Sequence, residues 1–394
     1  LDKNERLLEE LAKRFTQPAG IQTDLRRRIG EPATLKQSTE PRIVKLQDLA
    51  AVLVATLFEV FLTISRKRIA RLLGLAGIGV NEQRDLNRDL QEAISTDVAK
   101  SASHLLRMCI RAIDYCPPAD VTYGDYLRAM ITADNDLTGE DDRGYRTILA
   151  DAFRRRGIYP LGLGTMSPLD LVWPPPDTPI ELDREFTNES YPAKDRRTEF
   201  DRERERCQKL HLKWQAGAGL TPEAIRAMGL ALDKDDPHTI DRADNGLPRL
   251  SVDSFRLARR TGPKGEQVND WVITVSQQRR GYFDPETQKA QDEGEDRETP
   301  DFTFRGGCTL IVDAGTLEVR YCISKSLLSP GRLARFRESL LNRISVSPAF
   351  GKELKKKHEE PEEQDELEED EEKEENKEQV EPFFALRGGL TSFA

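Results

Sequence analysis

The sequence has few of the residues that catalytic and metal sites usually need. Its 394 residues include only four histidines, far apart in the sequence, and five cysteines, none of which forms a CxxC pair. The motifs HExxH, GxxxxGK[ST] and GxSxG are all absent. This composition argues against a zinc ribbon, a disulfide framework of the secreted type and the common phosphate-loop and serine-hydrolase sites. A metal site built only from this chain is not expected.

The remaining histidines and cysteines fit ordinary roles. His104 and His211 lie within helical patterns, so we expect them to be structural or surface residues. The odd number of cysteines predicts reduced thiols. The chain starts at Leu1 rather than methionine and shows no secretory leader, so we expect a cytoplasmic protein that is a processed product or a fragment.

A long apolar run is also missing. The most apolar stretch, QDLAAVLVATLFEVFLTISRKR, has only sixteen residues from Leu49 to Ile64, and three polar residues interrupt them. A membrane span needs about 20 mostly apolar residues. Apolar residues recur at steps of three and four, Asp48 can cap the start, and three basic residues suit the end. The pattern predicts a core helix over residues 48–68 and no membrane span.

Negative charge is concentrated near the end of the chain. Residues 359–378 hold fourteen acids and two lysines, a local charge of −12. Taking that −12 from the total of −10 leaves +2 for the rest of the chain. Like charges repel and the run has little apolar surface, so we expect a disordered tail. The last fourteen residues, EPFFALRGGLTSFA, form a hydrophobic motif with two open interpretations: docking on the folded part, or a free terminus.

The order of patterns predicts an α+β protein. Helical periodicity runs through the first part of the chain, until Trp173 opens a proline-rich segment that we interpret as a linker. A charged helix, short alternating runs typical of strands, and a last helix, RLARFRESLLNRI, follow. The expected parts are a helical lobe (1–165), a linker (166–198), a smaller α/β domain with antiparallel strands (199–350), a disordered charged tail (351–380) and the terminal hydrophobic motif (381–394).

One hairpin is expected in detail. CTLIVD and EVRYCIS alternate apolar and polar residues around a turn, AGTL, so they should pair as antiparallel strands. Cys308 and Cys322 would then lie nearly opposite each other. Two interpretations stay open, namely two small buried residues or a redox bridge. The charged segment 284–301 has no periodicity, and we expect it to be a loop.

The order of several segments resembles a group of large bacterial proteins related to the thermolysin-like zinc metallopeptidases, the gluzincins. The resemblance covers most of residues 1–325 and the last fourteen. Its most specific block runs from CIRAIDYCPP to FRRRGI, and supporting segments are LLEELAKRF, AVLVATLFEVFLTISRKR, FRGGCTLIVD, EVRYCI and EPFFAL. It implies a carboxy-terminal helical lobe under an active-site cleft, with the zinc motif HExxH in an amino-terminal half that precedes this segment.

The resemblance also implies one candidate site residue. In gluzincins the helical lobe supplies a histidine just before a buried helix, which stabilises the oxyanion as the zinc-bound water attacks. The matching position here is Gln47. Glutamine can donate a hydrogen bond but cannot titrate, so the contact would be weaker. The alternative is an ordinary surface glutamine at a helix start.

The resemblance predicts the carboxy-terminal region of a gluzincin-related metallopeptidase that is inactive alone, with zinc only in the missing half. Its expected partners are that half or another protein, with a peptide as possible substrate. The alternative is a non-enzymatic interaction module with vestigial peptidase ancestry. Basic clusters such as LRRRIG and FRRRGI suggest a nucleic-acid binder. The near-neutral folded part and the lack of interleaved aromatics argue against that third interpretation.

Overall fold

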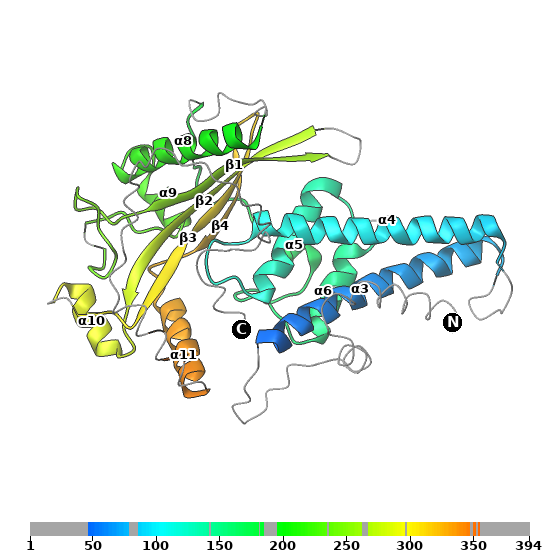
Figure 1. Ribbon diagram of the computed structural model, residues 1–394, viewed down its shortest axis with the longest axis horizontal. Helices are drawn as coiled ribbons and strands as arrows, with labels where there is room; N and C mark the ends of the chain where they lie inside the picture. The colour runs from blue at the N-terminus through cyan, green and yellow to red at the C-terminus, as the bar shows by residue number, and fades with distance from the viewer. Residues whose placement is uncertain are drawn as a thin grey trace, which may run out of the picture.

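The chain has the expected α+β class. In the computed structural model shown in Figure 1, a layer of helices packs on one face of an antiparallel sheet, and helix α8 lies on the other. Residues 46–50 and 346 are described by their backbone alone. The structure describes residues 46–78, 86–141, 143–180, 182–184, 195–234, 236–261, 267–295, 298–346, 350–351 and 354.

Several helices of the layer that packs on the sheet have capping residues at their ends. Asn87 accepts a hydrogen bond from the backbone N–H of Leu90 at 2.8 Å, and Thr122 and Asp125 form a reciprocal capping box. Gly157 has a φ of +72°, which suits the end of a helix. The elements are α3 (Leu46–Leu75), α4 (Arg88–Ala112), the 3-10 helix η2 (Ile113–Tyr115), α5 (Tyr123–Thr138), α6 (Tyr145–Arg155) and α7 (Pro168–Leu171).

The sheet is a four-stranded meander in the order β1-β2-β3-β4, with every neighbouring pair antiparallel. The predicted hairpin is confirmed as β3 and β4. Alternation along β2 sends Val272 toward the helical layer and its neighbours Trp271 and Ile273 to the opposite face. The strands are β1 (Ser251–Thr261), β2 (Gln267–Gly281), β3 (Phe302–Asp313) and β4 (Val319–Lys325).

The second face of the sheet is covered by α8 (Arg196–Gln215) and α9 (Pro222–Ala227). Leu210 and Trp214 of α8 are buried in one cluster with Phe255 and Trp271 of the strands. A separate cluster at one end of the sheet joins Phe302 and Phe304 to α11 (Pro330–Val346), and α10 (Pro285–Glu293) lies beside it (Figure 1).

The helical layer and the sheet share one hydrophobic core. Leu127, Met130 and Phe153 of the helices are fully buried in the same cluster as Val272 and Ile311 of the strands. Trp173 and Leu171, both within the predicted linker, pack in this cluster as well. The segments predicted as a lobe and a domain are therefore in direct contact, while their predicted boundaries stay predictions.

Two sequence predictions need correction. The predicted loop 284–301 contains helix α10, because Asp284 caps its start through Thr287, Pro285 fits its first turn and Gly294 ends it with a φ of +96°. Cys308 pairs with Ser324, and Cys322 pairs with Leu310, so the two cysteines are diagonal rather than opposite. The first predicted helix, the acidic tail and the terminal motif lie outside the described residues.

The helix predicted over 48–68 is confirmed and extends to Leu46–Leu75. Within the part of the chain that the structure describes, none of the helices combines the length and apolar character needed to cross a bilayer.

Candidate functional site

One side of α3 carries apolar residues that the core does not use. Leu53, Leu57 and Phe61 pack against the helical core, whereas Val54 and Phe58 stand outside the hydrophobic clusters of the described residues. Val54 is 54% exposed. Leu62, one turn beyond Phe58, is likewise outside these clusters and only partly buried. Val54, Phe58 and Leu62 follow one another at four-residue steps and so form one stripe, which we call the outer face of α3.

The candidate residue Gln47 belongs to the same helix. Its backbone lies in the first turn of α3, and its side chain is outside what the structure describes. By the 3.6-residue repeat, position 47 falls on the same side as Val54 and Phe58, which lie seven and eleven residues further on. The position matched to the gluzincin histidine therefore lies on the same side of α3 as the exposed Val54 and the half-buried Phe58.

The histidines do not form a catalytic arrangement among the described residues. Nε2 of His104 on α4 lies 2.8 Å from Oδ1 of Asp134, whose Oδ2 lies 3.3 Å from Nε of Arg146. The imidazole also contacts the ring of Tyr145, with 4.4 Å between centroids. No serine, threonine or cysteine side chain in the described part of the chain bonds to this imidazole, so it lacks the nucleophile of a triad. His104 joins α4, α5 and α6, as the structural interpretation predicted.

A buried cluster of charges joins the helical layer to the sheet. Its centre is Asp136 of α5, which lies 3.0 Å from Nη1 of Arg320 on β4 and 3.4 Å from Nη1 of Arg260 on β1. Both guanidinium groups also pair with Asp270 of β2. The hydroxyl of Tyr321 donates to Oδ1 of Asp136 at 2.7 Å. We call Asp136, Asp270, Arg260 and Arg320, with their tyrosine partners, the joint cluster.

The joint cluster is closed and electrically balanced. It holds two carboxylates and two guanidinium groups, and the side chains of Asp136, Arg260 and Asp270 are 6%, 5% and 1% exposed. Tyr115 of η2 donates to Asp136 and accepts from Nη1 of Arg260 at 2.7 Å. Burial first, and then the charge of Asp136, raise the pKa of both Tyr115 and Tyr321 well above the ordinary value. With every charge of the cluster paired, the cluster holds the helical layer on the sheet.

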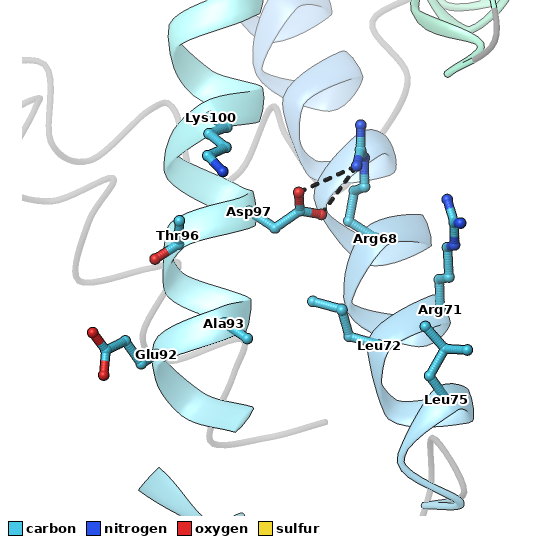
Figure 2. A pocket seen from close by; sticks show the side chains of 9 residues that line it. All are labelled: Arg68, Arg71, Leu72, Leu75, Glu92, Ala93, Thr96, Asp97 and Lys100. Carbon is cyan, nitrogen blue, oxygen red and sulfur yellow. Dashed lines mark hydrogen bonds and ion pairs between the residues drawn. The ribbon is translucent and has the colours of Figure 1, made fainter. Parts of the chain in front are cut away.

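One groove lies between α3 and α4, and no residue of the joint cluster lines it. The groove has a volume of about 470 Å³ and lies between the carboxy-terminal part of α3 and the amino-terminal part of α4 (Figure 2). Asp97 of α4 accepts from Nη1 of Arg68 across it at 3.1 Å, and Leu72 and Ala93 line its wall. Neither a histidine nor a cysteine lines the groove. In the described residues, no group of three histidine, cysteine, aspartate or glutamate side chains converges as metal ligands would.

Sequence reasoning missed the joint cluster entirely. Asp136 and its partner Arg320 lie 184 positions apart, and neither belongs to a motif. The available signal was a charged residue at strand positions that should face the core, such as Asp270 directly before the apolar run WVITV.

The thiols of the hairpin should remain reduced. Cys308 and Cys322 are both free, on one face of the sheet. Burial raises the pKa of the Cys308 thiol well above its ordinary value, that of Cys116 to about 12 and that of Cys207 to about 11. Iodoacetamide at pH 7.5 should leave Cys308, Cys116 and Cys207 unmodified in the native protein and label all five cysteines in denaturant. A Cys308–Cys322 linked peptide in a non-reducing digest would instead establish the redox bridge.

No protein-family model matches this chain, and neither a curated protein nor a solved structure matches it. The resemblance to the gluzincins therefore stays a prediction that rests on the segments quoted above.

Proposed function

We propose that this chain is the carboxy-terminal region of a gluzincin-related metallopeptidase and is inactive by itself. A zinc-binding half upstream of Leu1 packs on the outer face of α3, and together the two parts enclose the peptide-binding cleft. The zinc and its water belong to that half. This chain contributes one wall of the cleft, and Gln47, in the role that the resemblance implies, donates a hydrogen bond toward the oxyanion that forms during peptide hydrolysis.

The observation that carries the proposal is the outer face of α3. The segment Leu46–Leu75 is apolar on most of its surface, yet Val54, Phe58 and Leu62 lie outside the described hydrophobic clusters. A helix that is apolar all round is normally buried. Position 47, which the resemblance singles out independently, falls on this same side. The joint cluster supports the arrangement because it holds the helical layer rigidly on the sheet, as a wall of a cleft requires.

The rival function is a non-enzymatic interaction module, in which the same outer face of α3 binds a partner protein and no zinc half exists. Both functions use one surface, so the surface alone does not separate them. They differ in what the partner brings, because only a peptidase half supplies HExxH with a downstream glutamate.

The first test uses the purified chain, with zinc measured by mass spectrometry and casein as the substrate. We expect no stoichiometric zinc and no hydrolysis, because the groups that bind and activate the metal-bound water are assigned to the other half. One tightly bound zinc per chain together with proteolysis would overturn the proposal.

The outer face of α3 can be probed separately with the variant Val54→Glu. Glutamate favours helix more than valine does, and Val54 is outside the core, so the free energy of unfolding should change by less than about 0.5 kcal/mol. Anilinonaphthalene sulfonate, which fluoresces on apolar surface, should bind the variant about twofold less. The matched control is Val60→Ala on the same helix, which removes a fully buried side chain and should cost about 2 kcal/mol.

Unchanged dye binding in Val54→Glu, or a loss of stability close to that of Val60→Ala, would show that another part of the chain already covers this face. The proposed docking surface would then be wrong.

A further inference from the structure

Helix α4 and the first residue of η2 carry a second stripe of exposed apolar side chains. The buried face of α4 consists of Ser101, Leu105, Met108 and Ala112. On another side, three large residues spaced as i, i+4 and i+7 are exposed: Leu106 and Ile110 of α4 and Ile113, the first residue of η2, are 60%, 58% and 61% exposed. Isolated exposed apolar residues are common on protein surfaces, but three on one stripe are characteristic of a binding site. We call these three residues the α4 stripe.

Two arginines without acidic partners stand beside the α4 stripe. Among the described residues, neither Arg107 nor Arg111 makes an ion pair within 4.0 Å, whereas Arg68, Arg146, Arg154, Arg155 and Arg156 of the helical layer do. Burial lowers the pKa of Arg111, the charges of Arg260 and Arg107 lower it further, and Tyr115 and Asp134 act in the opposite direction. The neighbourhood is therefore apolar along one line, with two arginines beside it that make no close ion pair among the described residues. A matching ligand is an apolar segment that follows a run of negative charge.

This chain contains such a segment at its own end. Residues 359–378 carry fourteen acids, and Phe383, Phe384 and Leu386 come directly afterwards. Twenty-six residues separate Leu354, the last one that the structure describes, from Glu381. Fully extended, they would reach roughly 85 Å, so the segment can reach any face of a protein of this size without strain.

We propose that the terminal segment 381–394 docks on the α4 stripe of its own chain, with its phenylalanines on Ile110 and the acidic run beside Arg107 and Arg111. The covalent connection favours the chain's own terminal segment as the ligand of the α4 stripe. Joined by residues 355–380, the segment has an effective concentration in the millimolar range or above. A second copy of the chain could offer the same segment in trans, but only at its free concentration. The α4 stripe is distinct from the outer face of α3, so this inference does not depend on the proposed peptidase function.

The test uses the full-length chain with the photo-cross-linking residue p-benzoylphenylalanine in place of Phe384. After irradiation and digestion, mass spectrometry should map the cross-links to peptides that contain residues 106–113, within single chains. The substitution Ile110→Asp should lower that yield at least fivefold. Its matched control is Leu212→Asp on α8, which changes a residue with a similar exposure of 62% and should leave the yield unchanged.

Charge-reversal variants test the proposed attraction between the acidic run and Arg107 and Arg111. Arg107→Glu with Arg111→Glu should lower the cross-link yield at least threefold in 50 mM salt, and 1 M salt should lower the yield of the parent chain, because salt screens the attraction. The double change Lys67→Glu with Arg71→Glu on α3 is the matched control. Melting temperatures, measured for every variant, confirm folding, and Leu106→Asp replaces Ile110→Asp if the latter unfolds.

Three results would overturn the proposal. Cross-links to another surface would place the segment elsewhere, and an absence of internal cross-links would show that the segment does not dock on its own chain. Cross-links mainly between chains, seen as dimers on a denaturing gel, would assign the α4 stripe to a second copy.

Discussion

Replacing Asp136 with alanine should destabilise the protein by about 3–5 kcal/mol. The change leaves Arg260 and Arg320 to share the single carboxylate of Asp270, and it removes the acceptor of two buried tyrosine hydroxyls. Breaking a buried ion pair leaves an uncompensated charge without water, which costs far more than the intact pair contributes. Urea unfolding followed by circular dichroism measures the difference directly.

The control for Asp136→Ala is Asp151→Ala on α6. Asp151 pairs with Arg154 at 3.1 Å, but their side chains are 47% and 56% exposed, so water screens the attraction. The control should change stability by less than about 1 kcal/mol. If Asp136→Ala destabilises the protein no more than Asp151→Ala does, the joint cluster does not hold the helical layer on the sheet. That layer would then not be the rigid wall of a cleft that the proposed function needs.

The second large effect is expected from Gly307→Ala. Gly307 has a φ of +141°, and a Cβ at this position would meet the carbonyl oxygen of Val275 at 2.0 Å. The strand β3 would have to move away from β2 in the middle of the sheet, where both faces are covered. Steric overlap together with the unfavourable backbone conformation should cost about 3–5 kcal/mol, measured by the same urea titration.

Gly164→Ala is the matched control, because a Cβ there meets no atom within 4 Å and the residue does not have a positive φ. It should be neutral or stabilise the protein by up to about 1 kcal/mol through the unfolded state. An equally small effect of Gly307→Ala would mean that β2 and β3 do not approach as closely as the structure shows. Gly306, where a Cβ would meet the backbone of Lys325 and Leu327, also serves close packing.

Local patterns predicted much of the fold because their causes are local. The helix around residues 48–68 follows from apolar spacing, and the hairpin of β3 and β4 follows from alternation around a turn. Helix α10 was missed because its nine residues have no apolar face, although Asp284, Pro285 and Gly294 gave the start and stop signals of a helix. A prediction based on those end signals, rather than on the charged composition of the segment, would have identified α10.

The packing of the helical layer on the sheet could not be predicted in the same way. Asp136 and Arg260 meet across 124 positions of sequence, and pairing over such a separation leaves no periodic signal. The register of the hairpin was likewise predicted only to within two residues, because Cys308 and Cys322 are small enough to fit either alignment. For the candidate site, the resemblance implied position 47, and the structure adds that this position lies on the same side of α3 as Val54 and Phe58.

The proposed function depends on a zinc-binding half encoded upstream of Leu1. Sequencing the gene through its reading frame on the amino-terminal side of this segment is the most direct measurement. The peptidase proposal predicts a continuous frame that encodes HExxH, followed by a glutamate on a later helix. A frame that closes close to Leu1, or one that extends without that motif, would contradict the peptidase proposal and leave the outer face of α3 to a partner of another kind.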